Sequence, residues 1–378
     1  MANLLDRASV VLTPTAYNNG EALCIKPDDA SGDFTFSRNS AATRVNAQGL
    51  VENVQSLGSE LVTNGNFDTD SDWTKGTGWS ISGGTANCDG TQTSSTVMNQ
   101  SSVTNSNTNV KVSFTISGYV SGLIRVRNSG GFAGTYVSGN GTYVFYTNTG
   151  IATNIVLDAD AAFTGSIDNV SVKEVIDNTN LPRINYEGFS YDGSGNVVPD
   201  SGCGSWLFEP QSTNLIPYSE DYNSGNWFEY NETSATIDAS QSNPSGANGS
   251  YKIESLSGLG RFGLSAITVA PSTNYTLSFY VKNINATLLK VILGSGASPG
   301  SYTYTSEVNT SNWSRVSVNF TTGAVTSMQI QFLRDLPIGE SAYIWGAMLE
   351  QNSFSTSYIP TEGSTVTRNQ DLCTNAVV

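Results

Sequence analysis

Residues 60–73 read ELVTNGNFDTDSDW, and residues 214–227 read NLIPYSEDYNSGNW. Each stretch has an aliphatic pair, an aromatic residue, acidic or amide residues and a closing tryptophan, which follows Leu61 or Leu215 by 12 positions. The similarity continues in the same order, because KVSFTISGYV (111–120) matches YTLSFYVKNI (275–284) and SIDNVSVKEV (166–175) matches AYIWGAMLEQ (342–351). A set of segments that recurs in one order indicates a repeated structural unit. The sequence therefore predicts two copies of one module.

The composition favours an all-β chain. Only 38% of the 378 residues are hydrophobic and 13% are charged, while 37 are glycine. Short β-type runs such as LIRVRN, TYVFYT and MQIQFL are separated by Gly, Ser and Asn turns, at intervals typical of β-sandwiches. We expect two jelly-roll or β-sandwich modules on a small composite β base.

The chain divides into five segments by this interpretation. The first module covers 58–176 and the second 214–351, and they are separated by a connector, 177–213, that is too rich in aromatic residues for a flexible linker. PRINYEG (182–188) in this connector resembles TRVNAQG (43–49) in the lead segment, 1–57. We therefore expect the lead, the connector and the exit segment, 352–378, to form the base, with the first module inserted into it.

Charge and histidine content exclude several functions. A formal charge of −15 with only 17 basic residues argues against binding to nucleic acid, which requires clustered Lys and Arg. The sequence has no histidine, which removes Ser-His and Cys-His nucleophiles and histidine-based metal sites. Asp68 and Asp168 could be interpreted as a pair of glycosidase carboxylates, but capping of turns or binding of calcium fits them better. We expect no enzymatic activity.

Neither a leader nor a membrane anchor is expected. The first residues, MANLLDRASVVLTP, include a charge and lack the apolar stretch of a signal peptide. No run approaches the ~20 apolar residues that span a bilayer. The sequence predicts a soluble protein without membrane insertion.

Candidate ligand-binding and anchoring residues fall into two groups. Trp79 lies among glycines and small polar residues, as a sugar-stacking platform would, and Tyr143 and Tyr146 could line a groove on a sheet face. The alternatives are packing of Trp79 over the sandwich edge and ordinary cross-strand pairs of the tyrosines. The arginines outside the modules could pair with carboxylates or carbonyls where the base packs on itself or on a partner, or could be scattered on the surface. These are Arg38, Arg44, Arg183 and Arg368.

Several stretches of the sequence resemble those of two known groups of proteins. TNGNFDTDSDW (63–73) with SIDNVSV (166–172) resembles carbohydrate-binding jelly rolls. DFTFSRNSAATRVNAQGLVE, PRINYEG, SWLFEPQSTNLIPYSED and SFSTSYIPTEGSTVTR resemble structural proteins of tailed bacteriophages of the tail-fibre or head-fibre type. The second resemblance implies a virion protein that is made in the host cytoplasm, contacts other capsid or tail proteins, and forms a homo-oligomer, with a trimer favoured.

The jelly-roll resemblance also implies a structural Ca²⁺ in the first module. Its candidate ligands are Asn66, Asp68 and Asp168, which offer the oxygen atoms that this cation takes. In the second module Asn223 and Trp345 stand in place of the two aspartates, so no equivalent site is expected there.

Together these resemblances imply a non-enzymatic virion surface protein, anchored by its base, whose projecting modules hold host-surface glycans. Two alternatives are open. One is a capsid-decoration protein without a ligand, and the other is an accessory carbohydrate-binding part of a secreted glycan-degrading system.

Overall fold

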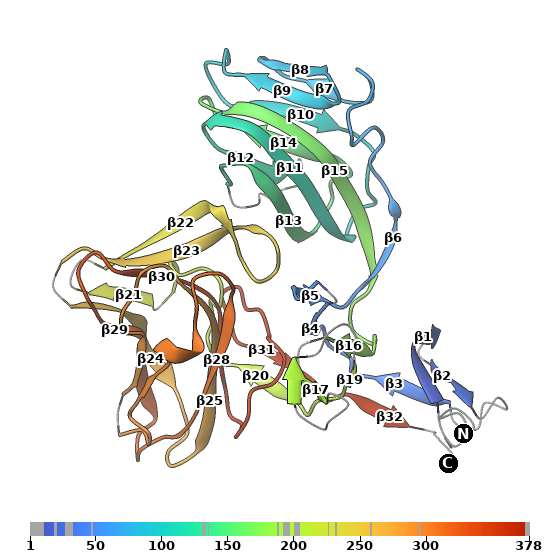
Figure 1. The fold of residues 1–378 in the computed structure, drawn as a ribbon. Coiled ribbons are helices and arrows are strands. Elements are labelled where there is room, and N and C mark those ends of the chain that lie inside the picture. Colours follow the sequence, from blue (N-terminus) through green and yellow to red (C-terminus); the bar gives the residue numbers. More distant parts are fainter. Residues whose placement is uncertain are drawn as a thin grey trace. The chain divides into compact units, whose positions relative to one another are not determined.

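The computed structural model describes residues 11–18, 21–26, 33–46, 48–130, 134, 136–186, 189–191, 197–199, 205–225, 227–230, 233–257, 259–294 and 296–374. Two compact units make up the chain (Figure 1). One comprises residues 55–177 with 238–250, and the other comprises residues 1–54, 178–237 and 251–378. Among the described residues no helix has the length and apolar character needed to cross a membrane.

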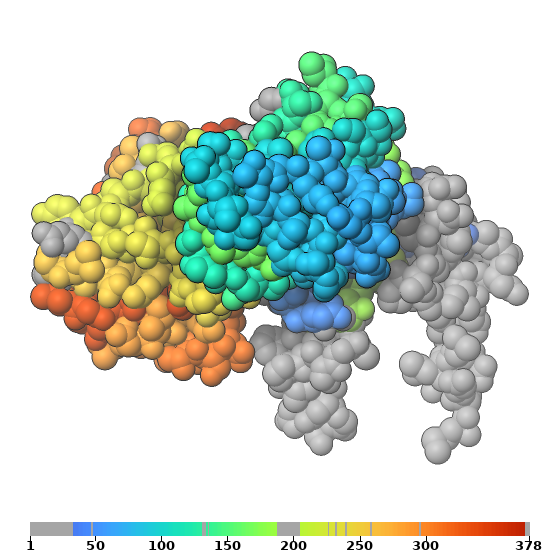
Figure 2. Space-filling view, turned by 90° about the horizontal axis from the view of Figure 1, so that it is seen from above, coloured from blue at the N-terminus to red at the C-terminus, as the bar shows by residue number. Residues whose placement is uncertain are grey.

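The first module is a sandwich of two antiparallel sheets. One sheet has the order β12-β14-β10-β7, and the other has the order β13-β11-β15-β9-β8, with β6 also paired to β15. Figure 2 shows the surface of this module in blue to green. Its strands are β6 (Ser56–Glu60), β7 (Thr74–Lys75), β8 (Trp79–Ser82), β9 (Thr85–Asp89), β10 (Thr96–Gln100), β11 (Asn109–Ser121), β12 (Ile124–Arg127), β13 (Gly141–Asn148), β14 (Ile155–Ala159) and β15 (Thr164–Asp177).

Alternation along the strands explains the core of this module. In β11 every second residue from Val110 to Ile116 is buried, while the residues between them are polar and partly exposed. Because successive side chains of a strand point to opposite faces, this pattern turns one side of the sheet toward its partner sheet. Phe67, Phe114 and Phe163 are among the fully buried side chains that fill the space between the two sheets.

The sheets of the second module repeat this topology for every strand except β6. Its sheets have the orders β21-β24-β29-β26-β27 and β22-β23-β30-β25-β28, so β27 is the one strand without a counterpart in the first module. Its elements are β21 (Trp227–Tyr230), β22 (Thr233–Ser242), β23 (Asn248–Ser255), β24 (Gly260–Thr268), β25 (Asn274–Asn283), β26 (Lys290–Leu293), β27 (Ser301–Thr303), η1 (Thr305–Glu307), β28 (Ser314–Thr321), β29 (Ser327–Leu336) and β30 (Ser341–Glu350).

Individual contacts repeat as well. The indole N–H of Trp73 donates to the carbonyl of Asn64 at 3.1 Å, and that of Trp227 donates to the carbonyl of Tyr218 at 2.9 Å, nine residues back in each case. The closing strands share a residue in the left-handed region, Asn169 in β15 (φ 53°) and Gly346 in β30 (φ 63°). The two stretches that opened the sequence analysis therefore fold alike, and the predicted all-β fold with two copies of one module is confirmed.

The remaining strands come from the lead, connector and exit segments. One four-stranded antiparallel sheet has the order β1-β2-β3-β32, and the other strands form antiparallel pairs in which β4 adjoins β5, β16 adjoins β19, β17 adjoins β18 and β20 adjoins β31. They are β1 (Val11–Asn18), β2 (Glu21–Lys26), β3 (Phe34–Ser37), β4 (Thr43–Val45), β5 (Val51–Asn53), β16 (Arg183–Asn185), β17 (Phe189–Tyr191), β18 (Val197–Pro199), β19 (Ser205–Leu207), β20 (Ser212–Asn214), β31 (Val366–Arg368) and β32 (Leu372–Thr374). We call these strands the base; they belong to the same compact unit as most of the second module.

Candidate functional site

The aromatic residues proposed for sugar stacking lie mainly in the core of the first module. Trp79 is only 7% exposed, and its ring centroid lies 6.0 Å from that of Phe163. The pattern of β8 turns Trp79 and Ile81 inward and the two serines outward. The prediction that Trp79 forms a sugar platform is therefore wrong, because its rings are covered by the sandwich.

Tyr143 is a core residue too. Its ring packs against Phe114, with centroids 5.8 Å apart, and its hydroxyl donates to the carbonyl of Ser138 at 2.5 Å. Burial raises the pKa of Tyr143 to about 12. The prediction that Tyr143 lines a glycan-binding groove is therefore wrong, because its side chain is buried in the core. Tyr146 differs, since it is 44% exposed and its ring lies 5.9 Å from Lys111 Nζ, so its role stays a prediction.

The candidate calcium ligands make local contacts. Asn66 Nδ2 donates to Asp68 Oδ2 at 2.5 Å. Asp168 accepts hydrogen bonds from the backbone N–H and the side-chain amide of Asn169, at 2.6 and 3.1 Å. Within the described part of the chain no three Asp, Glu or Cys side chains gather as a metal-ligand group. A calcium site at Asn66, Asp68 and Asp168 stays a prediction.

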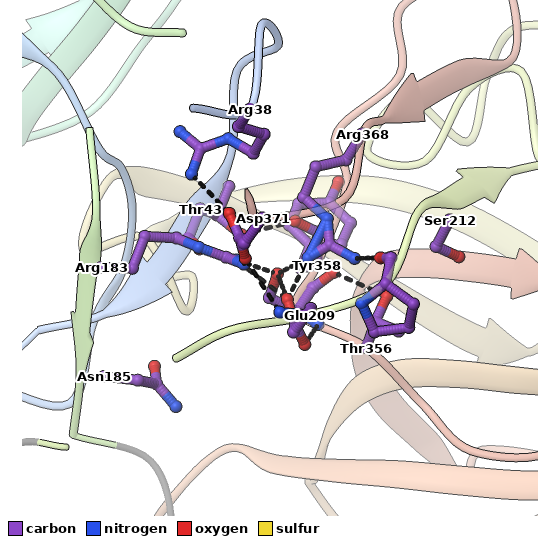
Figure 3. A network of polar contacts seen from close by, with 12 residues as sticks. Arg38, Thr43, Arg183, Asn185, Glu209, Ser212, Thr356, Tyr358, Arg368 and Asp371 are labelled. Carbon is purple, nitrogen blue, oxygen red and sulfur yellow. Dashed lines mark hydrogen bonds and ion pairs between the residues drawn. The ribbon is translucent and has the colours of Figure 1, made fainter. Parts of the chain in front are cut away.

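Three of the four arginines proposed for the base meet in one buried network (Figure 3). Arg38 Nη1 donates to Asp371 Oδ1 at 3.1 Å, and Arg183 Nη2 donates to Asp371 Oδ2 at 2.5 Å. Glu209 Oε2 pairs with Arg183 Nη1 at 2.9 Å and also with Arg368 Nη1. The network thus ties together the lead, the connector and the exit segment.

Charge in this network does not balance. Three guanidinium groups face two carboxylates, and the side chains of Arg38, Arg183, Arg368 and Asp371 are fully buried. Burial alone would raise the pKa of Glu209, but Arg368, Arg183 and the hydrogen bonds from Ser357 together outweigh it and hold that pKa below its ordinary value. Burial lowers the pKa of Arg38, although Asp371 opposes this change. Both pKa values are set by the same two effects, which are the removal of a charged group from water and its interaction with neighbouring charges.

Arg44 lies outside the network. It pairs across β4 and β5 with Glu52 at 2.8 Å, and the two side chains are 31% and 37% exposed. Exposed pairs of this kind contribute little to stability. Its sequence neighbourhood resembles that of Arg183, so only the structure separates their environments.

The outer face of one sheet in the first module carries a second polar group that the sequence analysis did not single out. In β12, Ile124 and Val126 are buried, and Arg125 and Arg127 lie on the other side, 28% and 33% exposed. Both arginines reach Asp158 Oδ2 of β14 through Nε, at 3.0 and 3.1 Å. The guanidinium of Arg125 also lies 4.3 Å from the ring centroid of Tyr136. We call this group the β14 face.

The equivalent sheet of the second module has a similar outer group. Lys290 Nζ of β26 and Arg334 Nε of β29 both contact Asp335, at 3.5 and 2.7 Å. Arg261 of β24 lies over the ring of Tyr230, 4.8 Å from its centroid, and pairs in register with Arg334. We call this group the β29 face. Each module thus carries one carboxylate shared by two basic side chains, and an arginine against a tyrosine ring.

A polar recess borders the β14 face. It encloses about 250 Å³ and is lined by Gly76, Thr77 and residues 92–97. Val97 of β10 belongs to this lining and pairs in register with Asp158. The only sequence signal for this site was the pair of arginines two residues apart in LIRVRN, in a chain with few basic residues.

The comparisons with known proteins found no matching family model and no matching curated protein. The tandem CBM22-1-CBM22-2 domain of Xyn10C from Paenibacillus barcinonensis is similar over 79% of this chain and 99% of that structure, with 12% identity and a TM-score of 0.29. The enzymatically active domain of tailspike protein 4 from bacteriophage CBA120 is similar over 36% of this chain and 21% of that structure, with 15% identity and a TM-score of 0.28. TM-scores this low carry no argument, and the fold class follows from the sheets described above.

Proposed function

We propose that this chain is a non-enzymatic glycan-binding protein whose two modules hold sugars on the β14 face and the β29 face. The supporting observation is the repeated arrangement on equivalent sheets, in which a tyrosine ring, an arginine and a carboxylate shared by two basic side chains lie together. Carbohydrate recognition uses an aromatic surface together with planar hydrogen-bonding groups.

The sequence resemblance to tail-fibre and head-fibre proteins supplies the setting of this proposal. In that setting the base docks to a capsid or tail, the protein forms a homo-oligomer, and repeated copies turn weak sugar contacts into avidity. The setting of a secreted glycan-degrading system is the alternative, and sugar binding by the modules is common to both.

A glycan array with the full chain tests the proposal. We expect retention of a subset of glycans and no release of reducing ends during long incubation with the same glycans. A uniformly blank array, with and without calcium, would refute glycan binding and leave the decoration role. Release of oligosaccharides would refute the non-enzymatic assignment.

A purely structural role is the second candidate, and the buried arginine network favours it. Three chain segments that are far apart in the sequence are joined by the ion pairs of Arg38 and Arg183 with Asp371. A rigid base of this kind suits attachment to a particle. If R183Q leaves incorporation into particles unchanged while the chain stays folded, the anchoring role of this network is excluded.

A further inference from the structure

We infer that the β14 face and the β29 face take sugars that carry a carboxylate, so that the ligand is an acidic glycan such as a polyuronate. This inference rests on the proposed function, because it names the ligand class of the same two faces. The argument comes from the charge of these faces and from the exposure of the basic side chains that the ion pairs hold.

Local charge on both faces is opposite to that of the whole chain. On the β14 face two guanidinium groups share one carboxylate, and on the β29 face Lys290, Arg334 and Arg261 accompany one carboxylate. The chain as a whole carries −15 and has 17 basic residues, so five of these residues on two equivalent faces are a marked concentration. A face with surplus positive charge attracts an anionic ligand.

The two arginines of the β14 face are held by one carboxylate and are partly exposed. In the described part of the chain Arg125 and Arg127 both bind Asp158 through Nε. About a third of each side chain is exposed, so both arginines are accessible to a ligand. Two guanidinium groups fixed by one carboxylate present planar donors that match the two oxygens of a sugar carboxylate.

An aromatic surface and a recess complete the β14 face. Tyr136 lies against Arg125, so the same guanidinium that would hold the carboxylate is held in place by the ring. The recess of about 250 Å³ at Val97 offers space for a neighbouring sugar and is lined mainly by Thr, Ser and Gln. A polymer with repeated carboxylates can therefore bind one residue at the arginines and place the next in a polar site.

Polygalacturonate and its methyl ester provide a matched pair of ligands, because they share a backbone and differ in charge. With the full chain, we expect affinity electrophoresis and calorimetry to show binding of polygalacturonate that weakens stepwise with methyl esterification. R125Q/R127Q and K290Q/R334Q should each reduce this affinity about tenfold or more, as expected for loss of charge-assisted hydrogen bonds. The control variant K173Q/K252Q removes the same charge from β15 and β23, in the other sheet of each module, and should change the affinity less than twofold.

Each alternative outcome has a distinct meaning. Equal binding of the acid and the ester would overturn the inference and leave the proposed function intact, whereas no binding of any glycan would overturn both. An equal loss in K173Q/K252Q would show that net charge alone attracts the polymer, which also overturns the inference. Tighter binding of a sulfated polymer of the same charge density would reject a carboxylate as the ligand group. Unchanged thermal unfolding of the variants is required for each comparison.

Discussion

Replacing Asp371 by Asn should destabilise the unit that contains the base. Its buried carboxylate accepts from Arg38 Nη1 at 3.1 Å, from Arg183 Nη2 at 2.5 Å and from the backbone N–H of Glu209 at 2.9 Å. Asn keeps the shape of the side chain and removes its charge. Three buried guanidinium groups would then face Glu209 alone.

The magnitude follows from the burial of the partners. Removal of one member of a buried ion pair costs about 3–5 kcal/mol, because the remaining charge stays buried without compensation. The matched control is E52Q, which breaks the pair with Arg44, whose two side chains are 31% and 37% exposed. An exposed pair contributes about 0–1 kcal/mol. D371N should therefore cost several times as much as E52Q.

Differential scanning calorimetry distinguishes these values. The chain has two compact units, and we expect the first module to unfold in a transition of its own. D371N should lower the transition of the other unit by roughly 10 °C, at about 2–4 °C per kcal/mol for a unit of this size. A shift no larger than that of E52Q, or a shift confined to the first module, would refute the reasoning.

Three further predictions concern single sites. Burial raises the pKa of Glu220 from its ordinary value of 4.5 to about 7, so the folded chain should lose stability as the pH rises between these values. Urea unfolding at several pH values should show this loss for the parent chain and not for E220Q. Equal dependence of the unfolding free energy on pH in both chains would contradict the prediction. W79A should destabilise the first module by about 3–5 kcal/mol without changing glycan affinity, and lost binding at unchanged stability would restore the sugar platform. Calcium should raise the melting temperature of the first module, and the double variant D68N/D168N should not respond; no shift in the parent chain would exclude the site.

The sequence predicts the fold more completely than it predicts the faces proposed to bind glycans. Duplication is visible in sequence because Leu61 to Trp73 and Leu215 to Trp227 form the same local structure, which needs the same residue types at the same spacing. The face of a strand is harder to assign. An aromatic residue such as Trp79 that alternates with serine fits an outward platform as well as a core position, and only the partner sheet decides.

Arg125 and Arg127 were missed for a different reason. Their role depends on Asp158, which lies 33 residues from Arg125 along the chain and on another strand. Nothing in LIRVRN distinguishes a guanidinium that shares a buried carboxylate from one in open solvent. Burial in the base could not be predicted for the same reason. Arg44 and Arg183 lie in similar stretches of sequence, but the side chain of Arg44 is 31% exposed and that of Arg183 is fully buried.

Glu60 and Asn214 occupy equivalent positions, each at the end of the opening strand of its module. Glu60 Oε1 in the first copy accepts from the backbone N–H groups of Val62 and Val172, and Asn214 Oδ1 in the second copy accepts from the corresponding groups of Ile216 and Leu349. A carboxylate can only accept, whereas an amide also donates.

The amide of Asn214 uses this capacity twice. Its Nδ2 donates to the carbonyl of Ala347 in β30 at 3.1 Å and to that of Ile359 in the exit segment at 2.8 Å, and all these groups are buried. The exit segment is thereby bound to the opening and closing strands of the second module, and it continues to Arg368 and Asp371 of the buried network. Glu60 cannot donate to a carbonyl, and it accepts instead from the backbone N–H of Val172 in β15, the strand that pairs with β6. The amide at this position thus joins the exit segment to the second module, a contact that the carboxylate of Glu60 cannot make.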